Sequence, residues 1–125
     1  MTVETIENTE IKTLTLQAGK AKQAITLMGK VAKSNLPVLD KRVCIRDGKI
    51  IATNLDTWVA WSPGGIDEDI RAVIPIEKIR NALKACSTKD NLTINVMDDG
   101  SVELVTKIAS TSFHDWNASE YPIMP

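Results

Sequence analysis

Residues 41–53 read KRVCIRDGKIIAT, which is two short apolar segments joined by Asp47-Gly48. Apolar and polar residues alternate through 41–46, and this alternation is typical of a strand with one buried face. An Asp-Gly pair favours a two-residue hairpin turn, because glycine adopts positive φ without steric cost. We therefore predict a β-hairpin whose return strand is 49–53.

The elements around this hairpin follow a definite order. A half-buried strand is predicted at 11–16, because polar and apolar residues alternate there, and a further short strand at 57–61. Apolar residues recur at helical spacing through 18–32, which predicts an amphipathic helix between the first strand and the hairpin. Leu36-Pro37 limits that helix, since the residue before proline avoids the helical region.

The second part of the chain repeats this order. It contains a predicted strand at 71–75, a helix at 76–86, a strand at 92–97, an Asp99-Gly100 turn, and strands at 102–106 and 108–114. The repetition predicts an α+β fold made of two pseudo-duplicated β-α-β-β-β units. Two helices would then cover one face of antiparallel sheets.

Length and composition indicate a cytoplasmic protein with one domain. The chain has 125 residues, of which 43% are hydrophobic, and it fits the usual size of about 100–200 residues per domain. No apolar run approaches the roughly 18 residues that would span a membrane. We expect residues 11–125 to form the domain and residues 1–10, which carry three Glu and no basic residue, to form a flexible acidic leader.

No cofactor, metal or catalytic centre is expected. Cys44 and Cys86 have neither metal-ligand nor disulfide-framework spacing, so two buried free thiols are the prediction. His114 is the single histidine of the chain. A small hydrolase using His114 and Asp115 is disfavoured, because adjacent residues of a strand point to opposite faces and no nucleophile accompanies them.

Charge is distributed unevenly along the chain. The whole chain has a formal net charge of −1, but residues 17–46 carry seven cations and one acid, a net charge of +6, which leaves −7 elsewhere. On an ideal helix, Lys22, Lys30 and Lys33 fall within a sector of roughly 80°. On the second predicted helix, Arg80 and Lys84 are one turn apart and away from the apolar face. Each helix would therefore bury one face and present a cationic face.

Such faces suit a phosphate backbone better than base edges. Lysine is a point charge that neutralises phosphate, whereas base reading requires arginine, asparagine or glutamine at contact spacing within a groove. The aromatic residues are sparse and far from the basic helices, so a base-stacking platform is not expected. The hypothesis is binding of duplex DNA without sequence preference.

The order of motifs resembles the first domain of the bacterial DNA polymerase III beta sliding clamp, over residues 11–122. The motifs that carry the resemblance are LPVL at 36–39, the Asp47-Gly48 hairpin, ATNLD at 52–56, VIP at 73–75 and WNASEYP at 116–122. The resemblance implies a DNA-clamp-like domain in a ring around duplex DNA, with helices lining the hole and sheets forming the outside and the subunit interfaces. The resemblance implies no enzymatic activity. It also implies that the domain serves a DNA polymerase indirectly, as part of a processivity factor.

The same resemblance adds candidate DNA-binding residues. Lys33 lies where the family carries a DNA-facing basic residue, and Lys78 and Lys84 match basic positions of the family's second helix. Helical geometry adds the remaining candidates, which are Lys20, Lys22, Lys30 and Arg80.

Two further questions stay open at the level of sequence. The family chain has three such domains, so this chain is either a first-domain fragment or a stand-alone relative that would need about six copies to close a ring. The alternative function is a protein-interaction or assembly module with the clamp fold and no DNA role. Such a module would act through exposed sheet edges near 108–114 or through Trp61.

Overall fold

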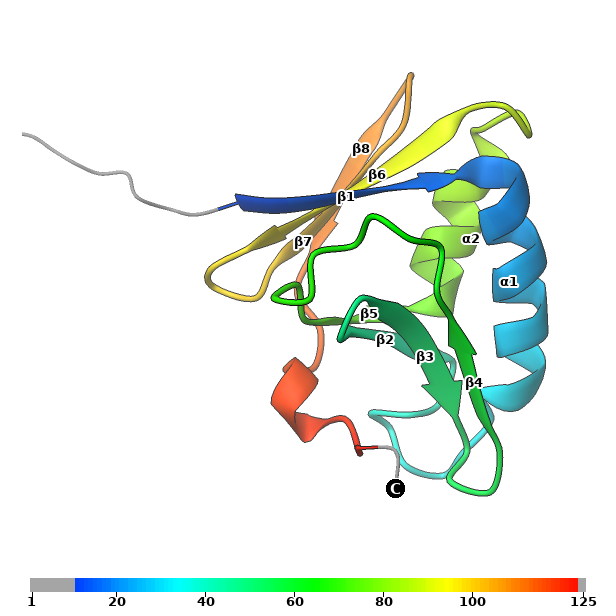
Figure 1. Cartoon of the computed structure of the whole chain (residues 1–125), viewed down its shortest axis with the longest axis vertical. Coiled ribbons are helices and arrows are strands. Elements are labelled where there is room, and N and C mark those ends of the chain that lie inside the picture. Colours follow the sequence, from blue (N-terminus) through cyan, green and yellow to red (C-terminus); the bar gives the residue numbers. More distant parts are fainter. Residues whose placement is uncertain (1–10, 124–125) are drawn as a thin grey trace, which may run out of the picture.

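The computed structural model describes residues 11–123, and the predicted leader at residues 1–10 lies outside them (Figure 1). The elements are β1 (Ile11–Gln17), α1 (Ala18–Val31), β2 (Arg42–Arg46), β3 (Lys49–Thr53), β4 (Trp58–Trp61), β5 (Ala72–Pro75), α2 (Ile76–Lys84), β6 (Asn91–Met97), β7 (Val102–Val105), β8 (Ser110–Phe113) and the short 3₁₀ helix η1 (Ala118–Glu120). Strand, helix and three strands thus occur twice, and the predicted duplication is confirmed.

The two halves exchange their first strands. One antiparallel sheet has the order β1-β6-β7-β8 and the other has the order β4-β3-β2-β5. Strand β1 of the first half pairs with β6 along its full length, from Ile11 opposite Met97 to Gln17 opposite Asn91. Strand β5 of the second half pairs with β2. Each sheet therefore contains strands of both halves, and neither sheet is complete without the other half.

Both helices pack against one face of the two sheets. In Figure 1, α1 and α2 lie side by side along one flank of the molecule, and the sheets lie on their inner side. The main hydrophobic core fills the space between them. Its members from α1 are Ala18, Ala21, Ile25 and Met28, and its members from α2 are Ile76, Ile79 and Leu83. The predicted arrangement of two helices on one face of antiparallel sheets is confirmed.

The sheet β4-β3-β2-β5 is also covered on its outer face. Cys44, Ile51 and Val73 point away from the helices and form a second buried cluster. The segment after β8 covers this cluster with Ala118 and Tyr121. By contrast, β6 alternates fully buried residues with half-buried ones, as a strand with one buried face does.

Some boundaries differ from those predicted. Helix α1 ends at Val31 rather than at residue 32, because Ala32 has ψ 60° and leaves the helical region. Helix α2 ends at Lys84 rather than at residue 86, because the amides of Ala85 and Cys86 donate to the carbonyls of Ala82 and Leu83, three residues earlier, in a tight final turn. Strand β8 is shorter than 108–114, because the side chain of Thr106 accepts from the amide of Ala109 (3.2 Å) and forms the preceding turn.

Candidate nucleic-acid interface

A groove of about 350 Å³ between the two helices brings three of the candidate cations together. Its walls are Lys22, Ile25 and Thr26 of α1 and Arg80, Leu83 and Lys84 of α2. Ile25 and Leu83 are buried and form its floor, whereas Arg80 and Lys84 are exposed. The spacing of 22, 25 and 26 on α1 and of 80, 83 and 84 on α2 is that of one helical face, which is why the periodicity of the sequence could locate these residues.

The three cations are held in different ways. The Nζ atom of Lys22, which is half-buried, donates a hydrogen bond of 2.9 Å to the carbonyl oxygen of Cys86 at the end of α2. Within residues 11–123, the side chains of Arg80 and Lys84 form no hydrogen bond or ion pair with the protein. Their donors are therefore available to a ligand that enters the groove.

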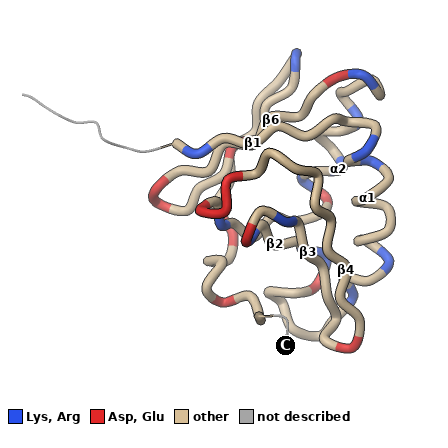
Figure 2. The backbone as a smooth tube through the Cα atoms, viewed as in Figure 1, with Lys and Arg blue, Asp and Glu red and all other residues tan. Residues whose placement is uncertain are grey.

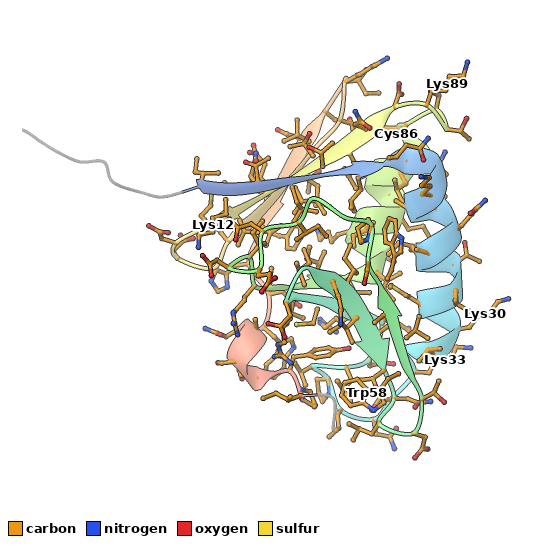
Figure 3. All side chains as sticks on the ribbon, viewed as in Figure 1. Lys12, Lys30, Lys33, Trp58, Cys86 and Lys89 are labelled. Atoms are coloured by element: carbon orange, nitrogen blue, oxygen red, sulfur yellow. The ribbon has the colours of Figure 1, made fainter. Side chains whose placement is uncertain are left out.

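Lys30 and Lys33 lie at the C-terminal end of α1. Lys30 is exposed in the last turn, and Figure 3 shows its side chain extending away from the sheets. Lys33 is exposed as well. The prediction that it shares one helical sector with Lys22 and Lys30 is wrong, because α1 ends at Val31 and Lys33 lies beyond it. The amide of Lys33 instead donates to the carbonyl of Val31 at 2.7 Å, in the turn that follows the helix.

Lys20 and Lys78 lie on the outer flanks of the helix pair. Lys20 borders a groove between α1 and β4, on the side of α1 away from α2. The Nζ atom of Lys78 lies 5.6 Å from the centroid of the Phe113 ring, over β8. The seven candidates are therefore not one patch: three surround the groove, two lie at one end of α1, and one lies on each flank.

Acidic residues are almost absent from the helix layer. Helix α1 contains no Asp or Glu, and α2 contains only Glu77, in its first turn. Figure 2 shows Asp and Glu gathered mainly in loops away from the helices. These include Asp67, Glu68 and Asp69 before β5 and Asp98 and Asp99 between β6 and β7. The outer face of the helices thus carries a net positive charge in a chain of net −1.

Two cations of the basic segment do not belong to this surface. Arg42 pairs with Asp115 through its Nε atom at 2.9 Å and also donates to the carbonyl of Pro37 at 3.0 Å. Arg46 is buried and donates to three carbonyl oxygens of the segment after β8. The net +6 of residues 17–46 therefore overstates the available positive charge, because both arginines hold the C-terminal segment in place.

Cys44, Cys86 and His114 lie in different surroundings. Cys44 and Cys86 are free and buried, as predicted. Burial raises the pKa of the Cys44 thiol to about 11, and burial also raises the pKa of the Cys86 thiol, so both stay protonated at neutral pH. The ring of His114 lies 3.0 Å from the carbonyl oxygen of Asp99, whereas Asp115 pairs with Arg42.

Two further properties concern the described part of the chain alone. Among residues 11–123, no three His, Cys, Asp or Glu side chains are placed to hold a metal ion. In the same range, neither helix has the length and apolar character needed to cross a membrane.

Comparison with known proteins identifies the architecture. No family model matches the chain, and neither does any curated protein. Among solved structures, the DNA polymerase sliding clamp from Pseudomonas aeruginosa matches with a TM-score of 0.71 over 91% of this chain, at 16% identity. The chain has the fold of a sliding-clamp domain.

Other clamps agree with this assignment. The DnaN sliding clamp from Bartonella birtlesii gives a TM-score of 0.72 over 93% of the chain at 12% identity. The beta subunit from the DNA polymerase of Streptococcus pyogenes gives 0.71 over 90% at 11% identity. The chain spans about a third of the length of these clamps, 32% in each case. The resemblance stated from the sequence is confirmed as one domain of a clamp.

Proposed function

We propose that the chain is a non-enzymatic sliding-clamp domain, located in the cytoplasm, whose helix layer contacts the backbone of duplex DNA. The observation that carries this proposal is the distribution of charge on the clamp fold. Lys22, Arg80 and Lys84 gather at one groove of the helix layer, and Lys30 and Lys33 continue the positive surface along α1. In a ring of clamp domains this layer would face the DNA, and the ring would serve a DNA polymerase by keeping it on its template.

The contact would be independent of sequence. Four of the five cations are lysines, which neutralise phosphates without reading base edges. Each phosphate neutralised releases a condensed counterion, so the affinity falls as salt rises. A clamp that moves along DNA requires such a contact, because a base-specific contact would hold it at one site.

The test is binding of the 125-residue chain to a duplex, measured by fluorescence anisotropy across a salt series. The diagnostic variant is the triple substitution Lys30→Gln, Lys33→Gln and Lys84→Gln, which removes exposed cations without removing a side-chain hydrogen bond or ion pair within residues 11–123. The control carries the same change of charge elsewhere, in Lys12→Gln, Lys49→Gln and Arg71→Gln. Figure 3 places Lys12 on the far side of the molecule from α1.

The expected result is a log–log slope that becomes shallower by about 2.7, or 0.9 per phosphate, in the diagnostic variant. The control should change the slope much less. A wild-type slope near zero, or an equal effect of the two variants, would reject the DNA role. Because a ring is held on DNA by encirclement, the molecular mass of the sample is measured alongside.

We also propose that such domains contact one another through their outer strands. Strand β4 is the last strand of the first half and β8 is the last strand of the second half, and each lies at an edge of its sheet. Edge strands present unpaired backbone groups. Beside β4 lies a groove of about 480 Å³, and the apolar residues that line it include Leu27, Val59 and Trp61. The side chain of Leu27 is 52% exposed. Beside β8, Ile108 is 79% exposed. Contact between unlike edges is heterologous and closes a ring where the rotation allows it.

Sedimentation over a concentration series tests this assembly. Ile108→Asp should reduce the mass of any oligomer, and Ile123→Asp is the matched control, because Ile123 is equally exposed at 79% but lies beyond η1. Oligomers that are unaffected by Ile108→Asp would contradict assembly through β8. A monomer at every concentration that also ignores DNA would favour the alternative, a protein-interaction module that uses the same exposed apolar edges.

A further inference from the structure

Helix α1 contains a glycine where it faces Arg80. Gly29 lies in the last turn of α1 and does not have a positive φ, so no turn or positive φ requires glycine there. A Cβ atom placed on Gly29 would lie 2.9 Å from the Nη2 atom of Arg80, closer than real Cβ contacts allow. Glycine is a poor helix former, so its presence inside a helix calls for a packing reason. The space over Gly29 is occupied by the guanidinium of Arg80.

The side chain of Arg80 lies against this glycine. The side chain forms no hydrogen bond or ion pair with other groups of residues 11–123. The residue is exposed and carries a long side chain, yet it lines the groove together with Lys22 and Lys84. Any side chain at position 29 would displace the guanidinium from α1. The flat backbone surface at Gly29 is therefore what lets the guanidinium of Arg80 lie against α1, beside the groove that Arg80, Lys22 and Lys84 line.

We propose that Gly29 is a positioning residue, which leaves room for the guanidinium of Arg80 against α1, so that Arg80 binds one phosphodiester group at the interhelical groove that Lys22 and Lys84 also line. The inference rests on the proposed DNA contact and names its central site. A guanidinium presents a planar pair of N–H donors that matches two phosphate oxygens, and the two ammonium groups add charge. The hydroxyl of Thr26 already donates to the carbonyl of Lys22 at 2.8 Å, so the three cations supply the binding.

The experiment is a double-mutant cycle of Gly29→Ala and Arg80→Ala, with duplex binding measured across a salt series. Gly29→Ala leaves the charge of the chain unchanged and favours the helix. We expect it to weaken binding about four- to eightfold at about 0.1–0.2 M salt and to reduce the slope by about 0.9, the effect of one lost phosphate contact. In the Arg80→Ala background it should cause no further loss, since it acts through Arg80.

Gly19→Ala is the control, because Gly19 lies in the same helix but a Cβ there would meet the carbonyl of Thr88, away from the groove. It should leave the slope unchanged. If Gly29→Ala weakens binding equally with and without Arg80, or not at all while the wild type binds, the inference is wrong and the proposed function stands.

A second measurement separates the two proposals when duplex binding itself fails. Inorganic phosphate is titrated into the full chain while the Nε–H resonance of Arg80 is followed by NMR. A saturable shift in the wild type that is lost in Gly29→Ala supports an anion site arranged by Gly29, whatever the DNA result. Equal shifts in both proteins, or none in either, overturn the inference.

Discussion

The guanidinium of Arg46 donates a hydrogen bond of 2.9 Å to the carbonyl oxygen of Tyr121 and lies 6.0 Å from the centroid of that residue's ring. Both side chains are buried. Arg46 also donates to the carbonyls of Ala118 (2.7 Å) and Pro122 (2.9 Å). One arginine of β2 therefore fixes the segment that covers the outer face of its sheet.

Replacing Arg46 by Met should destabilise the fold. The substitution keeps much of the apolar stem but leaves three carbonyls without their donor, and an unpaired buried polar group costs about 1–3 kcal/mol. We expect the free energy of unfolding in urea to fall by about 3 kcal/mol. Arg71→Met is the control, because the side chain of Arg71 is 59% exposed, and it should change stability by less than about 0.5 kcal/mol. Equal losses in the two variants would contradict this role of Arg46.

Thr53→Val should destabilise the hairpin between β3 and β4. Thr53 is fully buried, and its hydroxyl donates to the carbonyl of Thr57 and accepts from the amide of Leu55, each at 2.8 Å. Leu55 has φ 81°, a conformation that is unfavourable for leucine and needs such support. The isosteric substitution removes both bonds and should cost about 2 kcal/mol by thermal unfolding. The exposed Thr15→Val should be nearly neutral, and a similar cost there would refute the argument.

Alkaline pH should destabilise the protein through Cys44. Burial raises the pKa of the thiol from 9.0 to about 11, so between these values the unfolded chain releases a proton that the folded chain retains. The contribution is complete below pH 9 and is lost as pH rises toward 11, by roughly 2–3 kcal/mol in the free energy of unfolding. Burial also raises the pKa of Tyr121, so the free energy of unfolding should fall further above about pH 10.

Urea unfolding at pH values from about 8 to 10.5 tests this assignment. In Cys44→Ala, the free energy of unfolding should fall less steeply with pH than in the wild type. In Cys86→Ala, the part of the fall that is due to Cys44 should remain. If Cys44→Ala declines as steeply as the wild type, another group is responsible.

Turn chemistry made the two hairpins predictable from the sequence. Gly48 and Gly100 have φ 75° and 88°, the positive values that the Asp-Gly pairs indicated. The exchange of β1 and β5 between the halves was not predictable. Alternation shows that a strand has a buried face, but it does not identify the strand with which it pairs.

The candidate interface was predictable only in part. Periodicity placed Lys22, Arg80 and Lys84 away from the apolar faces of their helices, but it did not show that the helices bring them to one groove. It misplaced Lys33, because Leu36-Pro37 gives the latest end that a helix could have and not its actual end at Val31. The net charge of +6 for residues 17–46 included Arg46, because no local pattern shows that carbonyls more than 70 residues later would surround this side chain.

The exchanged strands should make the two halves unfold together. Leu14 of β1 is buried in the core and belongs to the sheet that contains β6, whereas Trp58 and Trp61 lie in the other sheet. Leu14→Ala should cost about 2–4 kcal/mol, as a buried cavity does. Because each sheet needs both halves, tryptophan fluorescence and far-UV circular dichroism should report the same lowered midpoint.

The exposed Thr15→Ala on the same strand is the control and should shift neither midpoint. If fluorescence kept the wild-type midpoint while circular dichroism moved, the sheet β4-β3-β2-β5 would be stable without the other sheet. The exchange of β1 and β5 would then fail to couple the halves, and the two sheets would have to be treated as separate folding units.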